Sequence, residues 1–96
     1  MKAVLIYESS ADVLDLAPIH FPAHKARIDA FQERGVLDAI GPFADPRDGA
    51  MGIFASREAA EEFVAEDPFV LEGVVVGHRI LEWYGETPLP RSLVDS

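Results

Sequence analysis

Apolar residues alternate between two faces along the first segment of the chain. Every position of residues 2–7 except the first is apolar. An extended chain would place Ala3, Leu5 and Tyr7 on one face and the β-branched Val4 and Ile6 on the other. Apolar side chains on both faces are typical of an interior strand, so this pattern predicts a strand that is covered on both sides.

Three later segments also favour strands. Residues 36–43 are mostly apolar and contain Gly41-Pro42 near their end, where a strand stops or bulges. Residues 44–49 have the composition of a turn, so residues 50–55 are expected to pair with the preceding strand as an antiparallel hairpin. Residues 74–84 begin with three consecutive valines and predict a fourth strand.

Two segments have the three- and four-residue spacing of an amphipathic helix. Residues 23–34 form the first, and Gly35 follows where a helix end favours positive φ. Ser56 is a candidate N-cap for the second, which should end before Pro68 because a proline disfavours the helical region at the preceding residue. Residues 8–22 are polar, contain prolines and lack a sustained period, so we expect a loop with room for one helical turn.

The predicted order is strand, helix, strand, strand, helix, strand. It indicates an α+β fold of the ferredoxin-like βαββαβ type, with a four-stranded antiparallel sheet and both helices on one face. We assign this domain to residues 1–85 and regard residues 86–96 as a C-terminal tail that is either mobile or packed on a partner subunit.

Both faces of the predicted sheet are largely apolar. In the last strand two apolar sets alternate, with Arg79 and Glu82 as the exceptions. One set is Val75, Leu81 and Trp83, and the other is Val74, Val76 and Ile80. A sheet with one face in water would alternate apolar with polar residues. We therefore expect a homodimer in which two copies stack the open faces of their sheets.

Composition narrows the classes of function. A chain of 96 residues has room for one domain. Seventeen acidic against 8 basic residues give a net charge of −9, which argues against nucleic-acid and membrane partners. The absence of cysteine excludes thiolate sites and disulfides. No apolar run approaches the roughly 20 residues of a membrane span and no signal segment opens the chain, so a cytoplasmic location is expected.

His24 and Asp67 are the residues best suited to chemistry. His24 shares the apolar stripe of the first helix with Ile28 and Phe31, four and seven residues on, so its imidazole should face the sheet and need a polar partner. Asp67 ends the second helix and could orient that ring. Together they would form a general base held in one tautomer. The alternatives stay open: His24 could be a structural histidine and Asp67 an ordinary turn residue.

Other candidates are weaker. His20 precedes His24 by four residues, a spacing that suits a metal only if the helix starts early, and Pro22 argues against that start; we expect no metal site. Tyr7, His78 and Trp83 are candidates to line a pocket for a flat organic substrate, with core packing as the alternative. No serine or threonine occupies a strand-to-helix elbow, which favours proton transfer over acyl transfer.

Four short motifs, in this order, resemble those of the YciI (YCII-related) family over residues 2–84. They are Pro22-Ala23-His24-Lys25-Ala26-Arg27, Gly35-Val36-Leu37, Gly41-Pro42, and Asp67-Pro68-Phe69-Val70 with Gly73-Val74. The resemblance implies a ferredoxin-like fold, a dimer of the dimeric α+β barrel type, and an active site on a His and an Asp, here His24 and Asp67. One departure is Phe21, where relatives often carry a basic residue that could bind an anion.

Residues and resemblance together predict a small cytoplasmic dimer with one pocket per subunit between the first helix and the sheet. His24 would act as general acid and base and Asp67 as its orienter, without a cofactor, in an isomerisation, elimination or dehydrohalogenation of a small, in some relatives cyclic, substrate. The alternative is a non-catalytic small-molecule-binding or regulatory dimer that uses the same pocket.

Overall fold

The computed structural model describes residues 1–85, so the predicted tail at 86–96 lies outside the described residues. Along the described part the elements follow in the order β1 (Lys2–Ser9), α1 (Val13–Glu33), β2 (Leu37–Pro42), η1 (Pro46–Asp48), β3 (Ala50–Phe54), α2 (Arg57–Glu66), α3 (Pro68–Leu71) and β4 (Val75–Trp83). Here η1 is a 3-10 turn that joins β2 to β3, and α3 is a single helical turn. The predicted order of strands and long helices is confirmed.

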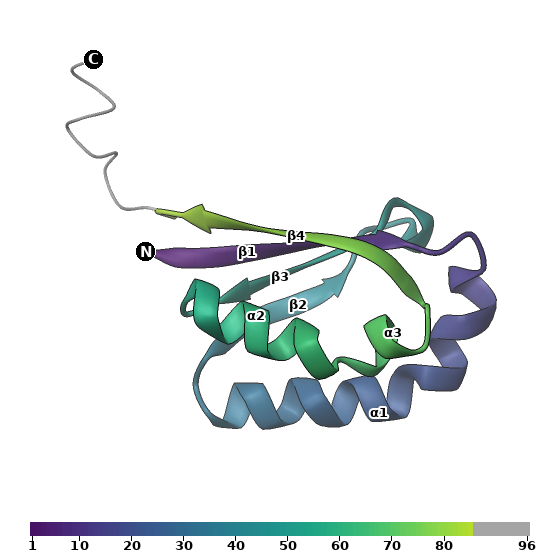
Figure 1. Cartoon of the computed structure of the whole chain (residues 1–96), viewed down its shortest axis with the longest axis horizontal. Helices are drawn as coiled ribbons and strands as arrows, with labels where there is room; N and C mark the ends of the chain where they lie inside the picture. The colour runs from purple at the N-terminus through teal and green to yellow at the C-terminus, as the bar shows by residue number, and fades with distance from the viewer. Residues whose placement is uncertain (86–96) are drawn as a thin grey trace, which may run out of the picture.

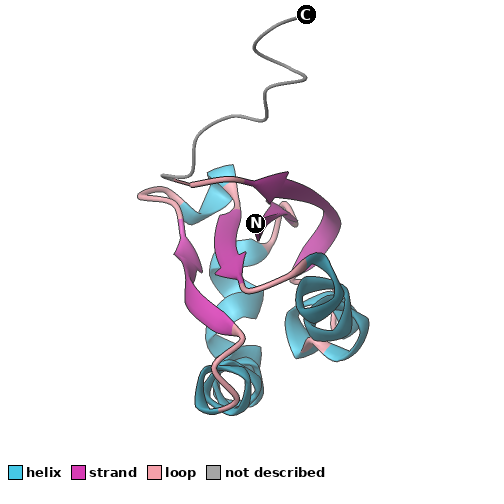
Figure 2. Ribbon diagram, turned by 90° about the vertical axis from the view of Figure 1, so that its left-hand side faces the viewer, coloured by secondary structure: helices cyan, strands magenta, loops and turns pink. Residues whose placement is uncertain are grey.

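The strands form one antiparallel sheet in the order β2-β3-β1-β4. Both views of the chain show α1, α2 and α3 on the same side of this sheet, with its other side uncovered (Figures 1 and 2). This arrangement confirms the ferredoxin-like α+β fold. It also brings the N-terminal end of α1 close to α3 and to the start of β4 (Figure 1).

The core lies between the sheet and the helices. Ala3 and Leu5 of β1 are fully buried on the helix-covered face, as the alternation predicts, and Tyr7 follows them at 3% exposure. Phe54 of β3 and Phe63 of α2 pack against each other with ring centroids 5.2 Å apart. Both rings are completely buried, so these two aromatic side chains join the sheet to α2.

Helix α1 starts ten residues earlier than the sequence pattern indicates, at Val13. The expectation of a loop over 8–22 was wrong because Pro18 and Pro22 both lie inside the helix. Each proline removes one backbone donor. The carbonyl groups that lose a partner are those of Leu14 and Pro18, four residues before each proline. Both residues are exposed, as is Pro22, so these carbonyl groups can bond to water instead.

An irregularity in the pairing of β1 with β4 changes the faces predicted for the last strand. The register shifts between Glu8 and Ser9, so that Ser9 pairs with Val75. Simple alternation placed Val75 and Leu81 on one face, which was wrong: Val75 is buried in the core, whereas Leu81 is 46% exposed on the uncovered face. Other exposed apolar side chains of β4 are Val76 and Trp83.

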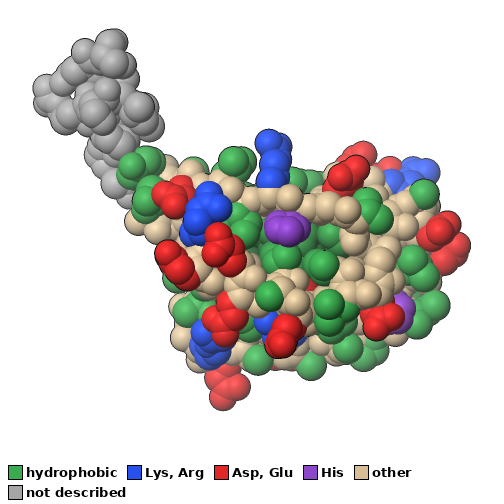
Figure 3. All heavy atoms as spheres, in the orientation of Figure 1, with side chains coloured by type: hydrophobic (Ala, Val, Ile, Leu, Met, Phe, Trp, Pro, Cys, Tyr) green, Lys and Arg blue, Asp and Glu red, His purple; other side chains and the backbone are tan. Residues whose placement is uncertain are grey.

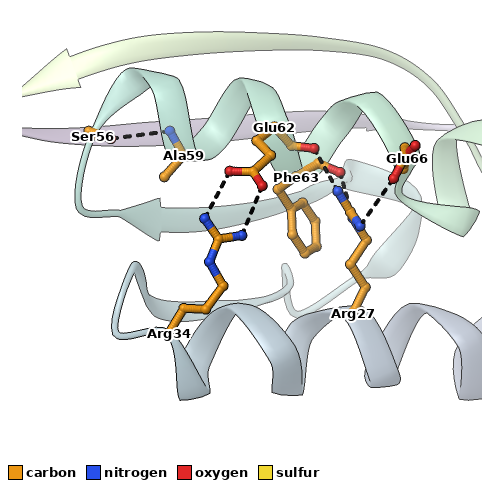
Figure 4. Close-up of polar contacts among 7 residues, drawn as sticks. All are labelled: Arg27, Arg34, Ser56, Ala59, Glu62, Phe63 and Glu66. Carbon is orange, nitrogen blue, oxygen red and sulfur yellow. Dashed lines mark hydrogen bonds and ion pairs between the residues drawn. The ribbon is translucent and has the colours of Figure 1, made fainter.

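Polar contacts join α1 to α2 (Figure 4). Arg27 donates from Nε to the carbonyl of Phe63 at 3.0 Å and from Nη2 to the carbonyl of Glu62 at 2.6 Å. Arg34 makes two bonds of 2.9 Å to the carboxylate of Glu62.

Ser56 accepts from the backbone N–H of Ala59 at 3.1 Å, which confirms it as the N-cap of α2.

Charge is dispersed over the face of the molecule shown in Figure 3. Acidic and basic side chains are intermixed there, while hydrophobic side chains and a histidine occupy its centre (Figure 3). None of the helices formed by residues 1–85 is long and apolar enough to cross a membrane.

Candidate functional site: a buried histidine and carboxylate beside a cavity

His24 lies on the buried face of α1, as its spacing to Ile28 and Phe31 predicts. Only 6% of the residue is exposed. The ring of Phe69, from α3, stacks on the imidazole with a centroid distance of 3.7 Å and an interplanar angle of 3°. Phe63 meets the imidazole edge-on at 6.1 Å. Aromatic rings therefore fix the plane of the imidazole.

Asp67 occupies the junction between α2 and α3. Its backbone is extended, at φ −67° and ψ 122°, because Pro68 disfavours the helical region there, as the sequence predicts. Its side chain caps α3 by accepting from the backbone N–H of Phe69 at 3.1 Å. The residue is fully buried, so local backbone chemistry aims a carboxylate into the core.

The structure brings His24 and Asp67 together. Nδ1 of His24 lies 2.6 Å from Oδ1 of Asp67, and the hydroxyl of Tyr7 donates to Oδ2 at 2.6 Å. An ionised carboxylate only accepts hydrogen bonds, so Nδ1 carries the hydrogen, and in the neutral ring the lone pair is then on Nε2. This is the geometry of a histidine base oriented by a carboxylate.

Nε2 of His24 has access to open space. No group of residues 1–85 bonds it, and no buried side-chain nitrogen or oxygen in this part of the chain lacks a partner. Nε2 is therefore accessible to solvent. His24 lines a cavity of about 700 Å³. A base with one nitrogen held and the other open can exchange a proton with a bound molecule.

Tyr7 is held in its neutral form. Burial raises the pKa of its phenol, and the negative charge of Asp67 and the hydrogen bond to it raise that pKa further. The phenol therefore remains a donor to Asp67 at any physiological pH. Sequence reasoning named Tyr7 as a pocket residue, which it is, but missed its bond to a carboxylate 60 positions away.

The cavity lies between α1 and the sheet, where it was predicted. Most of its lining is apolar, and the polar side chains in it are Tyr7, Ser9, His24, Lys25 and Gln32. Ser9 is engaged, because its hydroxyl donates to the carbonyl of Pro46 at 2.6 Å. The apolar walls include Phe21, Ile28, Ile40, Pro42, Phe69 and Val74. Such a lining suits a small, mostly apolar molecule with few polar groups.

The structure does not bring His78 and Trp83 to the cavity. His78 pairs with Tyr7 in the sheet. Because β4 is an edge strand, the imidazole of His78 is nevertheless exposed. Trp83 is 43% exposed and lies beside Lys2, on the uncovered face. Neither side chain lines the cavity, so the prediction that they do is not met within one chain.

His20 and His24 do lie on one helix, four residues apart, because α1 starts at Val13. The argument from Pro22 against an early helix start was therefore wrong. Within residues 1–85, however, no cluster of three or more His, Asp or Glu side chains could hold a metal ion. Nδ1 of His24 is already taken by Asp67.

Phe69 and Phe21 are the site residues that sequence reasoning missed. Phe69 covers one face of the imidazole, and Phe21 lies 6.3 Å from it on α1. A signal for Phe69 exists in the sequence, since it stands two residues after a capping Asp that precedes a proline. Phe21 was noted only as a departure from the family's pattern, and its contact with His24 could not be predicted because it depends on the unforeseen first turns of α1.

Comparisons with known proteins agree with this fold. The model of the YCII-related domain matches residues 1–84. No curated protein matches the chain. A solved structure with the same fold is 5-chloro-2-hydroxyhydroquinone dehydrochlorinase (TftG) from Burkholderia phenoliruptrix AC1100, in complex with 2,5-dihydroxybenzoquinone. It is 20% identical, has a TM-score of 0.71, and the match covers 86% of this chain and 93% of that one.

Proposed function

The chain belongs to the YCII-related domain family, and we propose that it is a cytoplasmic enzyme in which His24 moves protons on a small organic molecule bound in the cavity. One observation carries this proposal. His24 is held at Nδ1 by Asp67 over 2.6 Å while the ring lines a cavity of about 700 Å³. Proton transfer by a positioned side chain contributes typically about 10² to 10⁴ in rate.

In this mechanism Nε2 takes a proton from an acidic C–H or O–H of the substrate. The imidazolium that forms keeps its Nδ1–H bond to the Asp67 carboxylate, whose charge stabilises it. If the proton returns to another atom, the reaction is an isomerisation. If instead the freed electron pair forms a double bond and a leaving group departs with its bonding pair, the reaction is an elimination.

The substrate class we favour is a small ring compound that carries oxygen substituents. The apolar cavity walls, which include the aromatic rings of Phe21 and Phe69, suit a flat molecule. The structural neighbour is named for a dehydrochlorination and holds 2,5-dihydroxybenzoquinone. Loss of HCl from a chlorinated ring is one case of the elimination written above, which supports the same reaction class here.

A second candidate function is a non-catalytic binding or regulatory protein. It is favoured by the degree to which His24 is covered: its side chain is 8% exposed, bonded to Asp67 and stacked on Phe69. A histidine held in this way also serves as a satisfied structural residue.

Binding and turnover of two probes separate these candidates. The probes are 2,5-dihydroxybenzoquinone for affinity and 5-chloro-2-hydroxyhydroquinone for chloride release. We expect turnover by the wild type and a loss of about 10² or more in His24→Gln, with the affinity for the quinone changed only a few-fold. His78→Gln is the matched control, because that imidazole lies outside the cavity, and it should retain activity.

Two outcomes contradict the enzyme. If the wild type binds the quinone but releases no chloride, the binding function takes its place for this substrate class. If His24→Gln keeps the wild-type turnover while remaining folded by circular dichroism, His24 is not the base.

We extend the proposal to assembly. The uncovered face of the sheet carries exposed apolar side chains on β4 and half-buried ones on β1. They are Val76, Leu81 and Trp83, with Val4 and Ile6. Arg79, which pairs with Ile6, shares this face with them. Exposed apolar side chains gathered on one face mark interaction sites, and a second copy of the same face would cover them.

A further inference from the structure

The Asp67 carboxylate receives hydrogen bonds from three separate elements. Its donors are the hydroxyl of Tyr7 on β1, Nδ1 of His24 on α1 and the backbone N–H of Phe69 on α3, at 2.6, 2.6 and 3.1 Å. The residue is fully buried and Tyr7 is 3% exposed. In the intact protein the hydrogen bonds to this carboxylate therefore come from the chain itself.

The two oxygens of this carboxylate have different roles. Oδ1 accepts from His24 and from the backbone of Phe69, whereas Oδ2 accepts only from Tyr7 among residues 1–85. Without the Tyr7 hydroxyl, Oδ2 would be a buried anionic oxygen with no donor. Such an oxygen is stabilised by binding a proton, and the proton can reside on Asp67 or on the hydrogen-bonded His24.

We propose that Tyr7 is a positioning residue that acts through Asp67: its hydroxyl satisfies Oδ2, so that the pair holds one proton at Nδ1 and leaves Nε2 of His24 free to act as a base. The inference rests on the proposed function of His24. It assigns Tyr7 a role in the hydrogen-bond network in place of the substrate contact expected from sequence.

Other charged and titratable groups lie on the elements packed around this network. Arg27 and Lys25 lie on α1, and Arg27 is 3.9 Å from Glu66 of α2. His78 of β4 pairs with Tyr7 in the sheet. None of them bonds Asp67, so their charges act alike in wild type and in variants of Tyr7.

Histidine NMR tests the proposal without a substrate. The ¹⁵N shift of Nε2 reports the ratio of unprotonated to protonated Nε2 at a fixed pH. In Tyr7→Phe we expect this ratio for His24 to fall roughly ten-fold, since a hydrogen bond to a charged group is lost. Ser56→Ala, which removes the N-cap of α2, is a control for general destabilisation and should leave the ratio unchanged.

A second measurement covers the case in which Tyr7→Phe does not fold. Replacing tyrosine by 3-fluorotyrosine makes the phenol a stronger donor and keeps its shape. A stronger bond to Oδ2 should raise the ratio of unprotonated to protonated Nε2. An unchanged ratio in folded Tyr7→Phe, or in the fluorinated protein, would overturn the proposal.

Kinetics add an independent readout once a substrate is in hand. A positioning role lowers kcat of Tyr7→Phe near neutral pH with KM nearly unchanged, and raising the pH restores kcat because Nε2 is then free again. A substrate contact would raise KM instead. If the NMR ratio changes as expected while His24→Gln keeps full activity, the proposed function fails and the network inference survives.

Discussion

Arg27 of α1 donates to the backbone carbonyl of Phe63 in α2 at 3.0 Å, and its guanidinium lies over the Phe31 ring at 4.8 Å from the centroid. This contact joins the helix that carries His24 to the helix that ends at Asp67. Arg27 lies three residues after His24, so this polar link between the helices is close to the pair.

Arg27→Met should lower the free energy of unfolding by about 1 to 3 kcal/mol, because it removes bonds from a charged donor to helix-end carbonyls. Arg34→Met is the matched control: its ion pair with Glu62 is half exposed, and solvent screening should leave it with little effect on stability. Urea unfolding of both variants measures the difference. Equal losses would show that the Arg27 link has no special weight.

The raised pKa of Tyr7 predicts a loss of stability in alkali. In the unfolded chain the phenol titrates near its ordinary value of 10.0, whereas burial and Asp67 raise its pKa in the folded protein. The stabilisation is therefore complete below pH 10 and is lost as pH rises above it, since only the unfolded state releases the proton. The slope for this one group should rise from near zero at pH 9 towards about 1.4 kcal/mol per pH unit above pH 11, as the unfolded phenol becomes fully ionised.

Urea unfolding between pH 9 and 11 checks this slope, and Tyr7→Phe provides the comparison. The variant lacks the phenol, so its stability should fall less steeply in that range. Identical slopes in the two proteins would mean that Tyr7 ionises equally in both states.

Asp67→Asn should fold but lose activity. The amide oxygen can still accept from Phe69, whereas the loss of the negative charge removes the stabilisation of the His24 imidazolium. We expect kcat to fall by about 10² or more with the affinity for 2,5-dihydroxybenzoquinone nearly unchanged. A variant that turns over substrate at the wild-type rate would remove Asp67 from the mechanism.

Gly49 should tolerate no side chain. Its φ is +108°, and a Cβ would lie 2.2 Å from the backbone oxygen of Tyr7. Gly49→Ala is therefore expected to destabilise the fold by about 2 kcal/mol or more. Gly41→Ala is the control, since nothing lies within 4 Å of its added Cβ. Thermal unfolding of the two variants should differ by several degrees.

Two aspartate substitutions test the proposed dimer and the face assignment together. Val76 is 63% exposed and Leu5 is completely buried. Val76→Asp should leave a folded monomer, whereas Leu5→Asp should fail to fold because it buries a charge. Sedimentation with circular dichroism distinguishes the cases. A wild type that is monomeric at micromolar concentration contradicts the stacked-sheet dimer.

Features that depend on near neighbours in the chain could be predicted from sequence. Ser56 caps α2, Gly35 ends α1 with φ +76°, and Pro68 keeps Asp67 extended, all as expected. The reason is that capping and proline effects act within a few residues. The alternation of β1 and the spacing of His24, Ile28 and Phe31 likewise fixed which side chains point inward.

The contacts that make the site needed the tertiary structure. His24 and Asp67 are 43 positions apart, and Tyr7 and Asp67 are 60 apart. The sequence suggested that Asp67 could orient His24, but it connected Tyr7 with neither residue. The early start of α1 and the register shift of β4 depend on packing that outweighs local proline and alternation preferences. A single sequence fixes the direction of a side chain, while the distance to its partner is set only when the helices and the sheet pack together.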